Sequence, residues 1–224
     1  MTVSRFFVTG FFRLLTSLLC RIDDKALRAV PPAGPLILVS NHTHLIEIPI
    51  IYTRLQPRRV HGYIASHRWQ NPLLAWLLDT CETIPLQRGE ADISAIRRGL
   101  QLLQQKRTLI IMPEGTRNYT GVLQAAHPGV VTLALHSGAL IQAIATTGSE
   151  NFSQHLKNLH RCPFTFAVGP VFHLKNNGEK VTSQVRQAML MEIMAQIAVL
   201  LPESQRGVYA QSVHQTPRYV EFLE

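Results

Sequence analysis

The chain has few cysteines, few lysines and no long uninterrupted apolar segment. Its three cysteines, Cys20, Cys81 and Cys162, show no C-x-x-C spacing and cannot all pair within one chain. This usage indicates a reducing compartment and argues against a zinc site built on thiolates. No run of 18 or more residues is continuously apolar, so no segment has the pattern of a conventional membrane span. Apolar residues make up 46% of the chain and charged residues only 16%, which excludes a disordered or coiled-coil chain.

The chain is nevertheless basic, and most of its basic residues are arginine. Lys and Arg total 22 against 14 Asp and Glu, a net charge of +8, and 17 of the 22 are Arg. Because the guanidinium group grips phosphate and carboxylate through a planar fork of donors, the excess indicates an anionic partner. That partner is a nucleic acid, a phospholipid surface or a phosphorylated substrate. The basic residues are scattered and lysine is scarce, so we expect no nucleic-acid partner.

Residues 1–30 are predicted to form an N-terminal amphipathic, membrane-associating segment, followed by one domain over residues 31–224. Arg5, Arg13 and Arg21 are expected to lie at lipid headgroups, and a basic group over residues 54–68 also suits an anionic bilayer surface. We therefore expect a protein on the cytoplasmic face of a membrane, peripheral or monotopic. The alternative is a helix that packs on the protein's own core. The apolar residues that carry the helical spacing are Phe7, Phe11, Leu14, Leu15, Leu18 and Leu19.

After the Pro/Gly-rich break at residues 31–35, short apolar runs alternate with longer helical stretches. Apolar strands that alternate with helices predict an α/β fold with a mostly parallel central sheet covered by helices on both faces. In such a sheet, functional residues gather in the loops that leave the strand ends. The predicted strands are 36–39, 60–65, 83–87, 108–112, 140–147 and 164–172, and the predicted helices are 46–55, 69–80, 91–106, 129–137 and 181–201.

The loop after the first strand contains a histidine and a glutamate five positions apart. On an ideal helix this offset is about 140°, so His42 and Glu47 can meet only if His42 lies in a non-helical turn before the helix. If they meet, the carboxylate can hold one ring nitrogen while the other takes a proton from a hydroxyl. The alternatives are a helix cap beside a solvated side chain, or a metal site that includes His44 but lacks an evident fourth ligand.

Two further loops follow predicted strands and carry arginine. In the segment PEGTRN at 113–118, Gly115 permits a tight turn, Thr116 offers a hydroxyl and Arg117 offers a forked cation. The segment IPLQRG at 84–89 supplies Arg88. The alternative for both loops is a surface turn whose charges pair locally. Taken together, the three loops place His, Glu and two Arg residues where a parallel sheet builds a site.

The ordered segments NHTHLIEIP, IPLQRG, MPEGTRN, GPVFHL and LLPESQRGVY resemble the glycerolipid acyltransferases related to lysophosphatidate acyltransferase, over roughly residues 35 to 210. The resemblance implies an acyltransferase domain that needs no metal and no cofactor beyond its cosubstrate, acyl-CoA or acyl-carrier protein. It implies esterification of a lysophospholipid, 1-acylglycerol-3-phosphate, to phosphatidate. His42 would be the general base and Glu47 its orienting carboxylate. The phosphate-binding wall would be Arg88, Glu114, Gly115, Thr116 and Arg117.

The chain departs from this family's pattern at three positions. The signature is His, four residues, then Asp, whereas this chain has Glu47. Gln142 stands in an apolar strand that usually carries proline, and His127 stands where many relatives have Lys. Two other functions therefore stay open: a membrane-bound lipid-binding protein, and a lipid hydrolase in which His42 activates water. A serine hydrolase is not expected, because no G-x-S-x-G segment occurs.

Overall fold

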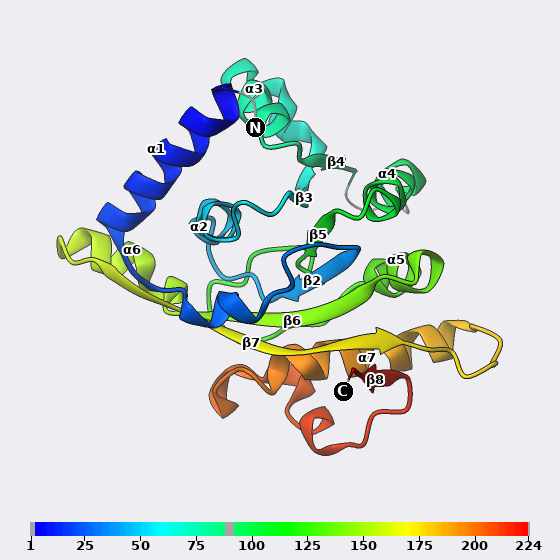
Figure 1. The fold of residues 1–224 in the computed structure, drawn as a ribbon. Coiled ribbons are helices and arrows are strands. Elements are labelled where there is room, and N and C mark those ends of the chain that lie inside the picture. Colours follow the sequence, from blue (N-terminus) through cyan, green and yellow to red (C-terminus); the bar gives the residue numbers. More distant parts are fainter. Residues whose placement is uncertain (1–2, 88–91, 224) are drawn as a thin grey trace.

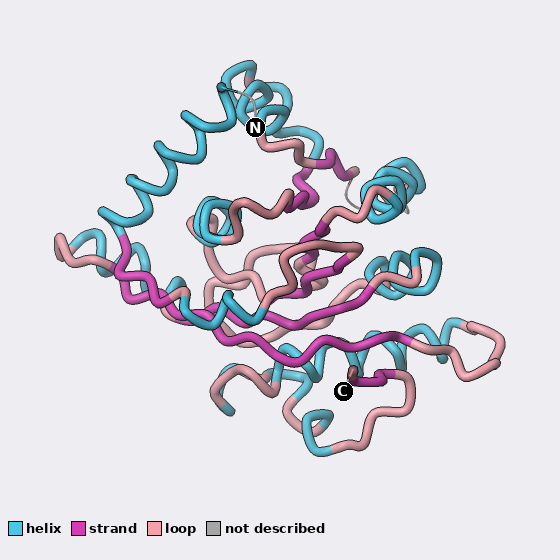
Figure 2. Tube along the Cα trace, viewed as in Figure 1, coloured by secondary structure: helices cyan, strands magenta, loops and turns pink. Residues whose placement is uncertain are grey.

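The computed structural model describes residues 3–87 and 92–223. Within them, eight strands form one sheet in the order β1-β7-β6-β2-β5-β3-β4, with β8 paired to β7. Figure 1 shows this layer with helices on both sides, and Figure 2 shows the loops that join them. The strands are β1 (Cys20–Asp23), β2 (Leu36–Ser40), β3 (Val60–Ala65), β4 (Ile84–Leu86), β5 (Thr108–Ile111), β6 (Leu140–Thr147), β7 (Cys162–Leu174) and β8 (Val220–Phe222).

The sheet is mostly parallel, as the alternation of apolar runs and helices predicts. Strand β2 lies between β5 and β6 and is parallel to both, and β3 continues the parallel order to β4. Strand β7 runs antiparallel to β6 and β8. Because β2, β5 and β6 are parallel neighbours, the loops that follow them leave the same edge of the sheet. This edge brings the motif-bearing segments together.

Helices cover both faces of the sheet, which confirms the predicted layers. Side chains of β2 alternate between two cores: Ile37 and Val39 pack with α4, α5 and α7, whereas Leu36 and Leu38 pack with α2 and with Phe152 of α6. All five residues of β2 are buried, because both faces are covered. The helices are α1 (Val3–Leu19), α2 (Glu47–Arg54), α3 (Pro72–Thr80), α4 (Ile93–Gln104), α5 (Gly129–Ser137), α6 (Phe152–Lys157) and α7 (Ser183–Ala198).

Several elements differ from the prediction. Strands β1 and β8 and helix α6 are additional, and β1 pairs in parallel with β7, so the sheet includes residues that precede the expected boundary at residue 31. The helix expected from Trp69 is divided into a 3-10 turn (Ser66–Gln70) and α3. The division occurs because Asn71 adopts an extended backbone and its side chain accepts a hydrogen bond from the Leu74 N–H at 3.1 Å, capping α3.

Helix α1 leaves most of its large apolar side chains exposed and buries Arg5, Val8, Thr9 and Thr16. Arg5 is 3% exposed, forms an ion pair with Glu82 at 3.4 Å and lies over the ring of Tyr52. The prediction that Arg5 lies at lipid headgroups is therefore wrong, because its guanidinium joins α1 to the domain, whereas Arg13 and Arg21 are exposed. Among the helices of the described residues, none combines the length and apolar character needed to cross a membrane.

Candidate active site

His42 and Glu47 meet at the edge of the sheet where β2 ends. His42 lies in the non-helical segment between β2 and α2, and Glu47 is the first residue of α2. This is the arrangement that their five-residue spacing requires. His42 Nδ1 lies 2.7 Å from Glu47 Oε2, and both residues are buried, with the His42 side chain retaining 11% exposure. The pair is thus shielded but reachable from one side.

The Glu47 carboxylate is fully buried and is surrounded by hydrogen-bond donors. The Thr43 N–H donates to both oxygens, at 3.0 and 3.1 Å, and the Thr43 hydroxyl contacts Oε1. The hydroxyls of Ser149 and Thr146 reach Oε1 at 2.6 and 3.4 Å. Burial raises the pKa of Glu47, but hydrogen bonds from His42, Ser149 and Thr43 outweigh it and hold the pKa below its usual value. Glu47 is therefore ionised at neutral pH.

An ionised carboxylate at Nδ1 determines which nitrogen of His42 is free to react. The neutral ring carries its proton on Nδ1 and donates it to Glu47, which leaves Nε2 as an acceptor. Within the described residues, Nε2 has no hydrogen-bond partner, so it can accept a proton from a bound hydroxyl. This is the base and orienter arrangement that activates an oxygen nucleophile.

The loop after β5 fixes the backbone of His42. Glu114 is buried, and its Oε1 accepts a hydrogen bond from the His42 N–H at 3.2 Å while Oε2 accepts from the Gln124 N–H at 3.0 Å. The Asn118 N–H donates to the His42 carbonyl at 2.8 Å. Burial raises the pKa of Glu114. Its carboxylate faces inward, toward these backbone groups, so it is not paired with Arg117 as the surface-turn alternative requires.

The next three residues of this loop are open to ligands. Gly115 and Thr116 are exposed, and Arg117 is half-buried with its guanidinium 5.6 Å from the centre of the Tyr119 ring. Gly115 has a φ of +68°, and a Cβ there would lie 2.9 Å from the His127 ring, so any other residue would be strained at this position. In the described part of the chain, Arg117 has no ion-pair partner, and its five donors remain available for an anion.

The described residues do not include one predicted site residue, and they do not support the metal alternative. Arg88 lies outside the described residues. In residues 3–87 and 92–223, no group of three or more His, Cys, Asp or Glu side chains is placed to hold a metal ion. His44, which the metal alternative includes, instead accepts a hydrogen bond from the Ile46 N–H at 3.3 Å and lies 4.8 Å from the Phe152 ring.

The residues that sequence reasoning missed come mainly from the end of β6. Asn41 joins the two strand ends, because its amide donates to the Thr146 carbonyl at 2.8 Å and accepts from the Thr146 N–H at 2.9 Å. Thr146 and Ser149 then reach Glu47. The available signal was the segment TTGS (146–149), which ends an apolar strand parallel to β2 and continues into the next turn. Polar residues at the end of this strand lie at the same edge of the sheet as the segment NHTH (41–44), which follows β2.

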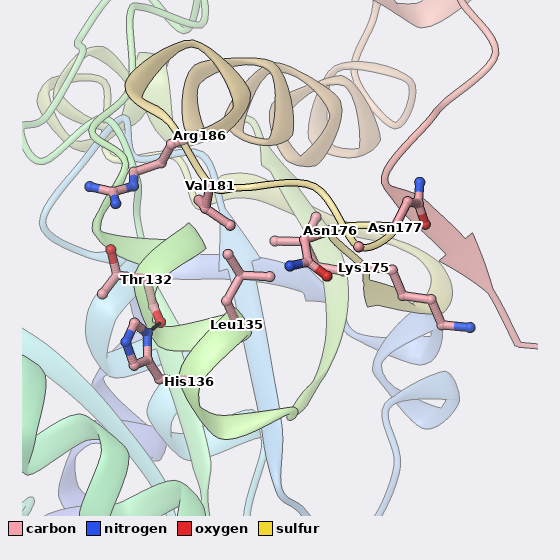
Figure 3. Close-up of a pocket in the computed structure, with 10 residues that line it drawn as sticks. Thr132, Leu135, His136, Lys175, Asn176, Asn177, Val181 and Arg186 are labelled. Atoms are coloured by element: carbon pink, nitrogen blue, oxygen red, sulfur yellow. Dashed lines mark hydrogen bonds between the residues drawn. The ribbon is translucent and has the colours of Figure 1, made fainter.

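A separate open pocket of about 530 Å³ lies between α5, the segment after β7 and α7 (Figure 3). It is lined by His136, Lys175 and Arg186, among others, and by no residue of the His42 site. Its two asparagines are occupied locally: Asn176 donates to the Glu179 carbonyl and Asn177 to the Arg218 carbonyl. We therefore place the candidate active site at His42 and not in this pocket.

Residues 21–147 match the family model described as acyltransferase. The match includes all but the first residue of β1, the strands β2 to β6, the His42–Glu47 pair and the loop at 113–118. Since it covers more than half of the 224 residues, the chain belongs to the acyltransferase family.

Curated relatives and a solved structure agree with this assignment. The chain is 30% identical over 115 residues to a lyso-ornithine lipid O-acyltransferase of Pseudomonas aeruginosa, covering 51% of this chain and 43% of that protein. It is 21% identical over 184 residues to a 1-acyl-sn-glycerol-3-phosphate acyltransferase of the same organism, covering 80% and 70%. The crystal structure of a 1-acyl-sn-glycerophosphate acyltransferase from Thermotoga maritima shares the fold, with a TM-score of 0.61, 17% identity, and coverage of 88% and 79%.

Proposed function

We propose that this protein esterifies the free hydroxyl of a lysophospholipid with an acyl group taken from acyl-CoA or acyl-carrier protein. The proposed acceptor is 1-acylglycerol-3-phosphate and the product is phosphatidate. The observation that carries the proposal is the buried His42–Glu47 pair, whose carboxylate holds Nδ1 and leaves Nε2 open. The proposal is supported by membership of the acyltransferase family and by the relatives' names.

In the proposed reaction, His42 Nε2 takes the proton of the acceptor hydroxyl as its oxygen attacks the thioester carbonyl. The new ester C–O bond forms, the C–S bond breaks, and the imidazolium returns its proton to the departing thiolate. Glu47 stabilises the transient imidazolium across the 2.7 Å contact. No covalent acyl-enzyme is required. Arg117 binds the acceptor phosphate, a charge-assisted contact that contributes about 1.5–3 kcal/mol.

The test is a panel of lysolipids offered with both donor types, with products detected by mass spectrometry. We expect lysophosphatidate to gain one acyl chain and to be a better acceptor than lyso-ornithine lipid, because Arg117 recognises phosphate. Arg117→Gln is expected to raise the KM for lysophosphatidate about 10-fold or more while changing little the KM for an uncharged acceptor, monoacylglycerol. Release of free fatty acid without ester would indicate a hydrolase, and binding without product a lipid-binding protein; either contradicts the proposal.

We also propose that the protein works at the cytoplasmic face of a membrane, held peripherally or monotopically by α1. In a water-exposed amphipathic helix the apolar stripe faces the core, whereas here three of the four buried residues, Arg5, Thr9 and Thr16, are polar, and Val8 is the fourth. Helix α3 contacts α1 and adds two exposed apolar residues to those of α1. The large apolar residues that α1 and α3 expose are Val3, Phe6, Phe7, Phe11, Leu14, Leu18, Leu73 and Trp76.

Two arginines of the 54–68 group serve the domain and not a surface. Arg54 donates to the Ser17 hydroxyl at 2.7 Å and pairs with Asp24 at 3.4 Å. Arg58 donates to the carbonyls of Val30 and Pro31. These contacts tie the segment before β2 to the end of α2, which leaves Arg59 and Arg68 as the exposed members of the group.

Phe7→Glu with Phe11→Glu is expected to weaken binding to vesicles of anionic phospholipid by about 10- to 100-fold or more, because two apolar side chains no longer enter the acyl boundary. Phe7 and Phe11 are 68% and 60% exposed, so their replacement leaves the core intact. Vesicle co-sedimentation measures the effect. Gln184→Glu with Gln187→Glu, two exposed positions of α7, is the control of equal charge. Equal binding by the two double variants would remove the α1 surface as the membrane contact.

A further inference from the structure

The turn after β6 directs a serine hydroxyl at the Glu47 carboxylate. Gly148 has a φ of +98°, and a Cβ there would collide with the Pro163 carbonyl oxygen, so the chain can turn at this point only with glycine. The turn starts the 3-10 helix Ser149–Asn151 and buries Ser149 completely. Ser149 Oγ lies 2.6 Å from Glu47 Oε1.

Apart from the Thr43 N–H, which donates to both, the two carboxylate oxygens of Glu47 have different partners. Oε2 faces His42 Nδ1, and Oε1 receives the hydroxyls of Thr43, Thr146 and Ser149. Thr43 and Thr146 belong to the segments that immediately follow or end β2 and β6, whereas Ser149 approaches from the turn beyond them. Its hydroxyl also lies 2.5 Å from the Thr43 hydroxyl, so the two form one network around Oε1.

A glutamate carboxylate stands at the end of three rotatable side-chain bonds, one more than in aspartate, so its direction must be fixed by contacts. A donor at Oε1 resists rotation of the group and keeps Oε2 directed at the imidazole. It also stabilises the charged form of a carboxylate that burial alone would neutralise. Both effects keep the proton of neutral His42 on Nδ1.

We propose that Ser149 is a positioning residue for the His42–Glu47 pair: through its hydrogen bond to Oε1 it holds the carboxylate that sets the tautomer of the base. Ser149 acts through Glu47 and does not touch the reacting atoms. This role rests on the proposed function for its kinetic consequence, but the tautomer of His42 can be observed without turnover.

The test compares Ser149→Ala with Ser40→Ala. Ser40 is likewise fully buried, and its hydroxyl has no hydrogen-bond partner in the described residues. Ser149→Ala is expected to lower kcat about 10- to 100-fold, the range for losing one hydrogen bond to a charged group, with KM within about 2-fold of the parent. Nitrogen-detected NMR of the imidazole is expected to show the Nδ1–H tautomer in the parent and a mixture with Nε2–H in the variant. Ser40→Ala is expected to resemble the parent in both.

Ser149→Cys separates the hydrogen bond from packing, because it fills the space with a weaker donor. We expect it to fall between the parent and Ser149→Ala. An unchanged tautomer in Ser149→Ala, or a Ser149→Cys variant equal to the parent, would overturn the positioning role. If the parent acylates no lysolipid in the panel, the proposed function fails, and the NMR comparison still decides the role of Ser149.

Discussion

His42→Ala is expected to lower kcat/KM for lysophosphatidate acylation by about 10²–10⁴-fold, the contribution of a well-placed general base. The reason is geometric: Nε2 of His42 is the ring nitrogen left open when Glu47 occupies Nδ1. Since the His42 side chain is 11% exposed and its backbone is held by Glu114 and Asn118, the variant is expected to fold. Initial rates with saturating acyl donor, followed by mass spectrometry, measure the loss.

His44→Ala is the matched control, because it removes a second imidazole two residues away. His44 contacts the Ile46 N–H and the Phe152 ring, not Glu47. Its pKa is lowered by burial. We expect it to retain activity within about 10-fold of the parent. Parental activity in His42→Ala, or a collapse confined to His44→Ala, would show that the base has been assigned to the wrong residue.

Much of the fold was predictable from the sequence because short apolar runs alternate with helical stretches and turn residues separate them. The run Leu36–Val39 is apolar and was predicted as a strand, and β2 extends it by only Ser40. Helix α5 (Gly129–Ser137) and strand β6 (Leu140–Thr147) have the predicted boundaries. Strand β1 was not predictable, because CRID at residues 20–23 carries two charges and becomes a strand only by pairing with β7. Tertiary pairing decides such short polar segments.

The orientation of side chains was the part that sequence could not supply. The spacing in α1 predicts an apolar stripe, but it does not say which face meets the domain; that is decided by the contacts of Arg5 with Glu82 and Tyr52. In the loop at 113–118 the residue types suggested a phosphate-binding wall. In the folded protein, Glu114 instead accepts a hydrogen bond from the backbone of His42, and Arg117 of the same loop is half-buried. The contacts that orient these side chains come from residues distant in the sequence, so a local sequence pattern does not reveal them.

Glu47→Gln is expected to lower kcat/KM by roughly 10³–10⁴-fold, the scale seen when the carboxylate that orients a catalytic histidine becomes an amide. The amide cannot accept the Nδ1 proton at one end and the Thr43 and Ser149 donors at the other without a mismatch, because one of its two terminal atoms is itself a donor. Glu47→Asp keeps the charge but withdraws it by about a bond length, for which we expect a loss of about 10²-fold. Full activity in Glu47→Gln would exclude the orienting role.

Glu47→Gln is also expected to have a pH-dependent effect on the stability of the protein, because Glu47 is ionised in the folded state. Its folded-state pKa lies below the ordinary value of 4.5. Ionisation therefore stabilises the folded protein fully above pH 4.5, and this stabilisation is lost as the pH falls through the folded-state pKa. The Glu47→Gln variant lacks this stabilisation at every pH, because its side chain does not ionise. Thermal unfolding is therefore expected to show a lower Tm for Glu47→Gln at pH 7 and a smaller difference at successive pH values below 4.5. A difference that stays constant over this range would mean that the carboxylate is not held ionised by His42, Ser149 and Thr43.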